Sequence, residues 1–285
     1  MNVLKTGLLL SLLTVLLVLI GQLMGGSQGA TTAFLFALVM NLGAYWFSDK
    51  LVLAMYRAKP LSEAEAPQVY RAVREIATRE RIPMPKLYWL PTVTPNAFAT
   101  GRSPRHASVA VTSGLLEIMS EEELKGVLAH ELSHVKNRDT LIMSIAAAVA
   151  GAISMLASWA RWGLMFGGNR EDDRRSGNAV LQLVALVIIA ILAPLAAMLI
   201  QLAISRTREY GADETGARLT GNPHGLASAL EKLDAAVKAH PLPNANPATA
   251  HLFIVNPLRA DAIAKLFSTH PPIEERVRRL RGMRL

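Results

Sequence analysis

The N-terminal part of the chain carries no charged residue from Thr6 to Ser48. A soluble domain rarely leaves so long a stretch uncharged, whereas about 20 apolar residues suffice for a helix to cross the hydrocarbon core of a membrane. Gly25-Gly-Ser-Gln-Gly29 interrupts the stretch near its middle, and such a cluster is typical of a tight turn. The pattern predicts two membrane spans, about residues 6–24 and 30–48, that form a hairpin.

Two further uncharged stretches predict a second hairpin. Residues 140–160 are rich in Ala and Ser, so a helix there can pack closely on a neighbour, and residues 179–204 are strongly apolar and contain Pro194. The chain is 51% hydrophobic but has 30 Lys and Arg against 22 Asp and Glu. This combination indicates a mainly α integral membrane protein, with four transmembrane helices joined to charged soluble segments.

Basic residues beside the span ends indicate the orientation. They gather on the side that holds Lys5, Lys50, Arg57, Lys59, Lys136, Arg138, Arg206 and Arg208. By the positive-inside rule, both termini and the segment between the hairpins are cytoplasmic. A cleaved signal peptide is the alternative for the first apolar run, but no Ala-x-Ala site follows it. The net charge of +8 requires no nucleic acid, because orientation and anionic lipid explain it.

The soluble segments predict a small α+β domain in two parts. The expected division is a hairpin over 1–54, a first part over 55–139, a second hairpin over 140–205 and a second part over 206–285. Residues 86–90 and 108–112 alternate like strands, with a short extended segment at 96–100 between them. Ser62 and Glu65 predict the start of a helix that runs to about Arg81.

A metal-binding pattern lies at His130, Glu131 and His134, which match His-Glu-x-x-His. On a helix, positions four apart share one face, so both imidazoles can reach one ion. Ser120 and Glu123 form a capping box that predicts such a helix. The pattern is typical of zinc hydrolases, although it also arises by accident on surface helices.

A third ligand follows from the predicted topology. If the second pair of spans is antiparallel, the chain returns to the same membrane face just after Ser205, near the motif. Glu209 and Asp213 lie there, four residues apart. Glu209 can complete a His2Glu zinc site with one open position, and Asp213 can accept a hydrogen bond from a ligand imidazole. The alternative is a solvated helix start in which Glu209 pairs with an arginine.

Peptide hydrolysis is the chemistry that these groups suit. Zinc activates water, and Glu131 can accept its proton and pass it to the leaving amine. His270 is a candidate oxyanion donor, although a histidine at a helix start is more often structural. The segment Asn96, Ala97, Phe98 and Ala99 could be an exposed edge strand that pairs with an extended peptide, or an ordinary hairpin strand.

Several motifs in order resemble the HtpX family of bacterial membrane zinc metalloproteases, relatives of the CaaX prenyl-protein endopeptidases. They are Asn96–Gly101, Ala129–His134, Ser205–Asp213 and Ser268–Pro272. The resemblance implies one zinc ion per chain held by His130, His134 and Glu209, with Glu131 as base and with His270 and Arg276 at the active site. It also implies an inner-membrane location and quality control of membrane proteins under envelope stress.

Two other functions remain open from the sequence. An intramembrane protease would place the motif inside a span, but Lys125, Lys136, Arg138 and Asp139 surround it, and charges in hydrocarbon are costly. A metal-binding transporter or scaffold without proteolysis would need polar ligands deep in the spans. The predicted spans contain no Asp, Glu or His.

Overall fold

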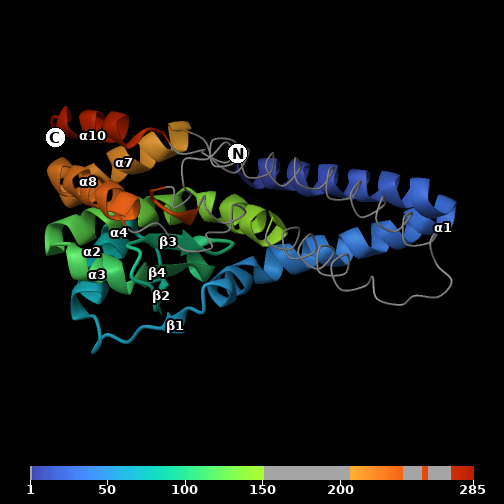
Figure 1. The fold of residues 1–285 in the computed structure, drawn as a ribbon, viewed down its shortest axis with the longest axis horizontal. Helices are drawn as coiled ribbons and strands as arrows, with labels where there is room; N and C mark the ends of the chain where they lie inside the picture. The colour runs from blue at the N-terminus through green and yellow to red at the C-terminus, as the bar shows by residue number, and fades with distance from the viewer. Residues whose placement is uncertain (1, 151–205, 240–251, 256–270) are drawn as a thin grey trace, which may run out of the picture.

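The computed structural model describes residues 2–150, 206–239, 252–255 and 271–285. The predicted span over 179–204, residues 151–160 of the span over 140–160 and His270 lie outside these residues. In Figure 1 a long helical hairpin extends from a more compact part that contains the sheet and the shorter helices. The predicted combination of helices with a small sheet is confirmed.

The N-terminal hairpin is helix α1, Asn2–Met55, which is broken at Gly25 and Gly26. Gly26 has a φ of 58° and a ψ of −146°, a conformation that only glycine adopts at little cost. The two halves pack antiparallel, and a hydrogen bond joins them: the Asn41 amide donates to Thr14 Oγ1 at 2.8 Å. The turn is shorter than the predicted Gly25–Gly29.

Membrane-spanning length is reached by one helix within the described residues, Gly25–Met55. The first half of the hairpin contains a shorter apolar helix, Thr6–Leu19, and another follows at Asp139–Ala150. The latter is where the third span was predicted, and Leu141, Ile145 and Val149 in it pack against Leu13 and Ala44 of α1. Four spans are thus not confirmed by the described residues.

A four-stranded sheet has the order β1-β2-β4-β3. Strands β2, Lys86–Leu90, and β4, Ser108–Thr112, have the predicted bounds and are parallel. The short β1, Lys59–Pro60, is antiparallel to β2, and β3, Ala97–Thr100, is antiparallel to β4. The predicted extended segment therefore forms an edge of the sheet, and no other described strand pairs with β3.

Helix α2, Pro67–Glu80, begins later than predicted. Ser62 and Glu65 do interact, since the Ser62 amide donates to Glu65 Oε2 at 2.9 Å, but they form a turn. Pro67 is the reason, because a residue before proline is pushed away from the helical region, and Ala66 has a φ of −143° and a ψ of 67°. The predicted start at Ser62 is therefore wrong, while the end near Arg81 is confirmed.

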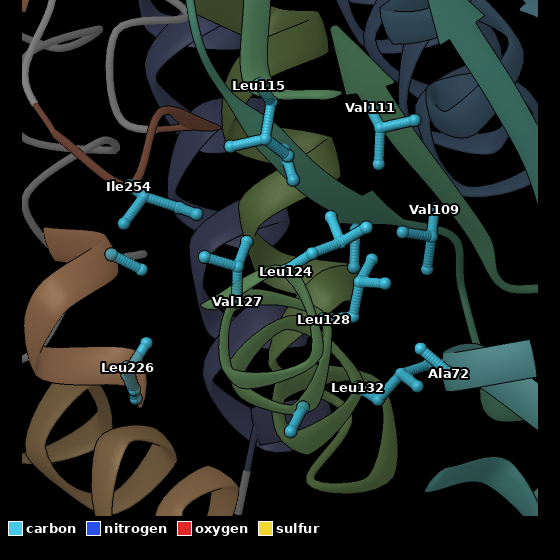
Figure 2. Close-up of a cluster of buried hydrophobic side chains, with 14 of the residues drawn as sticks. Ala72, Val109, Val111, Leu115, Leu124, Val127, Leu128, Leu132, Leu226 and Ile254 are labelled. Carbon is cyan, nitrogen blue, oxygen red and sulfur yellow. The ribbon is translucent and has the colours of Figure 1, made fainter. Parts of the chain in front are cut away.

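The core is organised around α4, Glu121–Lys136. The predicted capping box is present, with Ser120 and Glu123 bonded reciprocally. Figure 2 shows how the apolar side chains of α4 are shared among its neighbours: Leu128 faces Val109 of β4, Leu132 faces Ala72 of α2, and Leu226 of α8 lies opposite Val127. Burial of these side chains fixes the helix, so its remaining face can carry polar groups.

Among the described residues, three more helices belong to the compact part: α7, Arg206–Thr220; α8, Pro223–Ala239; and α10, Ile273–Arg281. Two short elements flank β4, namely the 3-10 turn η1, Pro104–His106, between β3 and β4, and α3, Ser113–Ile118, between β4 and α4. Helix α7 approaches α4 closely at Gly216, where an added Cβ would lie 3.0 Å from the His130 backbone nitrogen. The absence of a side chain at 216 therefore sets the spacing between the two helices.

Candidate metal centre

Two histidines of α4 converge on one point. His130 and His134 are one turn apart, both are buried, and their Nε2 atoms lie 3.3 Å from each other. Apolar packing on the opposite side of α4 holds both rings on the face that looks toward α7. The helical spacing predicted from the sequence is confirmed.

Glu209 reaches the same point from the first turn of α7. Its Oε1 lies 3.5 Å from His134 Nε2, and its Oε2 lies 3.7 Å from His130 Nε2. The three residues offer ligand atoms that all lie within 4.8 Å of one another, and all three are buried. The structure thus brings together residues that are far apart in the sequence, as the predicted topology requires.

The arrangement fits a small divalent cation. In a tetrahedral zinc site with bonds of about 2.0–2.2 Å, the ligand atoms are roughly 3.3–3.6 Å apart, close to the observed spacings. Each imidazole also has a carboxylate at its other nitrogen: His130 Nδ1 is 2.9 Å from Asp213 Oδ1, and His134 Nδ1 is 3.1 Å from Asp139 Oδ2. Such partners leave both Nε2 atoms available as metal donors.

Arg276 of α10 is fully buried behind Asp213. Its Nε and Nη2 donate to the two oxygens of Asp213 at 2.8 and 2.7 Å, which is a bidentate pair. Its Nη1 donates to the Ile254 carbonyl at 3.2 Å and lies 3.7 Å from Glu209 Oε2. Although burial alone would raise the pKa of Asp213, the Arg276 guanidinium lowers it, so this carboxylate stays ionised.

Glu131 lies beside the cluster and points toward the sheet. Its Oε2 accepts a hydrogen bond from the Ala99 amide of β3 at 2.9 Å. Burial raises the pKa of Glu131, and the neighbouring Glu209 adds to the rise, while the two histidines and the Ala99 amide oppose it. A carboxylate with a raised pKa is suited to exchanging protons near neutral pH.

Negative charge also raises the pKa of His134, to about 9. Burial opposes the charged imidazolium, but the hydrogen bond to Asp139 and the carboxylates of Glu209 and Glu131 outweigh that effect. Without a metal the cluster therefore attracts a proton. A divalent cation at the Nε2 atoms would compete with that proton for the same lone pair.

The predicted substrate segment is placed differently from expectation. β3 is an edge strand, but it is not exposed, because Ala97, Phe98 and Ala99 are at most 2% accessible. Helix α4 covers one face, and the Asn96 side chain accepts a hydrogen bond from the Ile254 amide at 3.1 Å. Phe98 packs on Tyr56 instead of facing the histidines. The main chain of Ala99, which touches Glu131, is the part of the segment nearest the cluster.

Two contacts of the cluster were not foreseen from the sequence. The sequence predicts Asp139 only as a charge that keeps the motif out of hydrocarbon, although an acid five residues after the second histidine is also a candidate partner for that imidazole. The Ala99–Glu131 hydrogen bond had no sequence signal, because it joins a main-chain amide to a residue on another element. The structure otherwise gathers the predicted residues, with His270 outside the described part.

The model of "Peptidase family M48" matches residues 63–284 of the chain. The "Protease HtpX homolog" of Syntrophobacter fumaroxidans is 60% identical over 280 residues, which is 98% of each chain. The protein of the same name from Pyrococcus furiosus is 58% identical over 277 residues, 97% of this chain and 94% of its own. The crystal structure of S. mikatae Ste24p covers 87% of this chain and 57% of its own, at 18% identity and a TM-score of 0.48.

Matches that span nearly the whole of both chains at this identity establish the family. The clustered histidines and carboxylates also suit the chemistry that the family name states. The chain is therefore a metalloprotease that belongs to peptidase family M48 and, within it, to the HtpX proteases.

Proposed function

We propose that the chain is a membrane-bound zinc endopeptidase that cleaves extended segments of misfolded or damaged membrane proteins at the cytoplasmic face. The observation that carries the proposal is the convergence of His130, His134 and Glu209 within 4.8 Å, with Glu131 beside them. Two imidazoles and one carboxylate are the ligand set of zinc peptidases, which leave a further position for water or substrate.

Each residue of the cluster has a role under this proposal. His130, His134 and Glu209 would hold the ion, which when bound supplies a Lewis acid and lowers the pKa of water. Glu131 would take a proton from the attacking water and deliver it to the leaving amine. Asp213 and Asp139 would fix the two imidazoles, and Arg276 would hold Asp213 in place.

Substrate binding would use the main chain of β3. In its antiparallel pairing with β4, alternate residues direct their N–H and C=O groups away from β4, and the Ala99 amide points toward Glu131. Ala97 and Ala99 are buried and the Ala99 amide is bonded to Glu131, so an extended peptide would have to displace this cover and this hydrogen bond. Added there, it would bring a backbone carbonyl close to the metal centre. Such pairing needs no particular side chain, so we expect weak sequence preference.

A membrane location is supported by the α1 hairpin. Gly25–Met55 is long and apolar enough to span, and its many exposed apolar side chains, such as Leu35, Val39 and Leu42, suit contact with lipid. With the family resemblance, we propose four spans, about 6–24, 30–48, 140–160 and 179–204, in the bacterial inner membrane. The metal centre and both termini would be cytoplasmic, with the catalytic domain formed by 55–139 and 206–285.

No observation favours a transporter or scaffold. The cluster lies at α4 and α7, near the sheet, and the apolar stretch of α1 contains no Asp, Glu or His. Substrate recognition would therefore take place beside the membrane instead of within it.

The test compares Glu131→Gln with Glu121→Gln. Both changes remove one carboxylate from α4, but Glu121 is exposed and far from the cluster. Detergent-purified proteins would be given an unfolded membrane protein, and zinc content would be measured on the same samples. We expect the Glu131 variant to keep about one zinc and lose cleavage by at least about a hundredfold. Cleavage at the wild-type rate by this variant would refute the assigned base.

A further inference from the structure

Most basic side chains in the helical part of the molecule have an acidic partner. Arg74 pairs with Glu63 at 2.8 Å, Lys125 with Glu75 at 2.7 Å, and Arg281 with Glu231 at 2.8 Å. Several others form no ion pair within the described residues. Four of these, Lys50, Lys86, Arg102 and Arg105, line one hollow of about 450 Å³.

The hollow lies where the long apolar helix meets the sheet. Lys50 comes from the last turns of α1, Lys86 begins β2, and Arg102 and Arg105 belong to the loop that joins β3 to β4. Asp49 is the one acid that lines it. Three separate segments of the chain thus place four positive charges around one space against a single negative charge.

Exposed apolar side chains share this hollow. Trp46 is 49% accessible, Phe47 is 52% accessible and Met84 is 39% accessible. The Arg102 guanidinium carbon lies 4.5 Å from the centre of the Trp46 ring, and Lys50 Nζ lies 5.3 Å from the centre of the Phe47 ring. Aromatic rings beside cations, with the ring bodies open, are typical of the boundary between hydrocarbon and lipid headgroups.

The basic loop is preformed. Gly101 has a φ of 124°, and an added Cβ would lie 2.1 Å from the His106 carbonyl oxygen, so the loop closes tightly on itself. The Ser103 hydroxyl and His106 Nδ1 are 3.0 Å apart across the same turn. The backbone that carries Arg102 and Arg105 is therefore fixed before any binding partner arrives.

We infer that this hollow binds the phosphate headgroup of an anionic phospholipid. The inference rests on the membrane placement of α1 in the proposed function, since that placement sets Trp46 and Phe47 at the lipid boundary. A phosphodiester would meet Arg102, Arg105 and Lys86, while its acyl chains follow the apolar surface of α1. Unpaired cations beside exposed aromatic rings suit a ligand that is anionic at one end and apolar at the other.

Headgroup binding would also position the catalytic domain. The loop that carries Arg102 begins directly after Thr100, the last residue of β3. A lipid held by this loop would fix the height of β3, and hence of the peptide paired with it, above the membrane surface. The site would thus couple the lipid surface to the strand that we propose binds substrate.

Quenching of Trp46 fluorescence tests the inference directly. The purified full-length chain would be titrated in mixed micelles with brominated phosphatidylglycerol or brominated phosphatidylcholine, and the Trp46→Phe variant would be subtracted to isolate Trp46. Each cation near an anionic lipid contributes about fivefold in affinity, so three of them give up to about a hundredfold, and we expect half-maximal quenching at an at least roughly tenfold lower fraction of the anionic lipid. Equal quenching curves for the two lipids would overturn the site.

Two triple variants test whether the cations of the hollow cause the preference for the anionic lipid. Changing Lys86, Arg102 and Arg105 to Gln should bring the two quenching curves together. The control changes three ion-paired cations elsewhere, Lys238→Gln, Arg74→Gln and Arg281→Gln, and should keep the difference between the lipids. Retained lipid discrimination in the first variant would refute the assignment, and the wild-type comparison stands even if that variant folds poorly.

Two further outcomes separate the alternatives. Competition by millimolar inorganic phosphate would show a site for free phosphate and would overturn the lipid assignment. Absence of Trp46 quenching by either lipid would refute the membrane placement of α1, and the lipid site with it. Because cleavage by the wild type and the Glu131 variant is measured separately, neither result bears on the metal centre.

Discussion

Helix α4 has buried acidic side chains near both ends, and the two ends neutralise them differently. At the first turn, Glu123 accepts hydrogen bonds from Ser228 Oγ at 2.6 Å and Lys232 Nζ at 2.7 Å, both from α8. The charges of one carboxylate and one ammonium group cancel, so this cluster is neutral without a bound ion. We call it the capping cluster.

The far end of α4 is unbalanced. The carboxylates there are Glu131, Asp139, Glu209 and Asp213, and the described cations within ion-pair distance are Arg276 and Arg208. With neutral histidines, four negative and two positive charges leave a formal charge of −2, which one divalent cation would cancel. One helix thus holds a cluster that is neutral by itself and another whose formal charge an ion would balance. Four changes test this difference.

Loss of Glu209 should have the largest effect. In Glu209→Gln the one charged donor of the three becomes neutral, so we expect loss of bound metal and a fall in cleavage of at least about 10³-fold. Metal content and peptide cleavage would be measured at fixed free zinc, with Glu214→Gln on the exposed side of α7 as the control. Full metal occupancy in the Glu209 variant would contradict the assigned ligand set.

Loss of Arg276 should mainly affect folding. Arg276→Met leaves Asp213 buried without its cation, and removal of one partner from a buried pair costs about 3–5 kcal/mol. Thermal unfolding in detergent with a chelator present would measure the change, and Asp213→Asn in the same chain should recover part of it. The exposed Arg281→Met should cost less than about 1 kcal/mol. Equal effects of both arginine changes would contradict this account.

Loss of Asp139 should weaken metal binding without removing it. Asp139→Asn keeps a partner near His134 but reduces the basicity of the ring, so we expect about 10–100-fold lower metal affinity. Competition with a chromophoric chelator would measure the affinity, and Asp234→Asn on α8 serves as the control. Unchanged affinity would indicate that Asp139 has only a structural role.

Loss of Glu123 should lower the stability of the fold without changing metal binding or cleavage. Although burial opposes its charge, hydrogen bonds from Lys232, Ser228 and Ser120 lower the pKa of Glu123 from 4.5 to about 2. A lowered pKa stabilises the fold above pH 4.5, and that stabilisation is lost as the pH falls toward 2. We expect Glu123→Gln to cost about 1–2 kcal/mol near neutral pH, allowing for solvent screening at the half-exposed Lys232.

Unfolding of the wild type and the Glu123 variant, measured with a chelator from pH 7 to pH 3, checks this. The difference in their free energies of unfolding should narrow as the pH falls below about 4.5. Their cleavage rates and metal contents at pH 7 should stay equal. A constant difference at every pH, or lost metal, would show that the two clusters are not independent.

The sequence predicts the parts of the site that depend on local rules. The capping box at Ser120 and Glu123 and the helical spacing of His130 and His134 involve contacts within one helix, and both are confirmed. The helix start at Ser62 is wrong because Pro67 overrides the same kind of box. Identical local signals therefore lead to different structures when a proline lies nearby.

Contacts between elements were predictable only where topology restricted them. The approach of Glu209 to the histidines followed from the expected return of the chain to one membrane face. The contact of Asp139 with His134 depends on how the chain turns after α4, which the spacing of the two residues suggests but does not fix. The contact of Ala99 with Glu131 depends on main-chain direction, which no spacing in the sequence encodes. The burial of β3 was missed for the same reason, because α4 and residues 252–255 cover it.

If substrates pair with β3 as we propose, the position of this strand at the edge of the sheet makes cleavage a competition between two rates. Pairing with Ala97 and Ala99 requires a stretch of chain whose own amides are not yet bonded, and refolding withdraws those amides. A substrate that refolds faster than it pairs would escape, and one that lingers would be cut. The half-life of the unfolded state, instead of any recognition sequence, would then decide which proteins this enzyme removes.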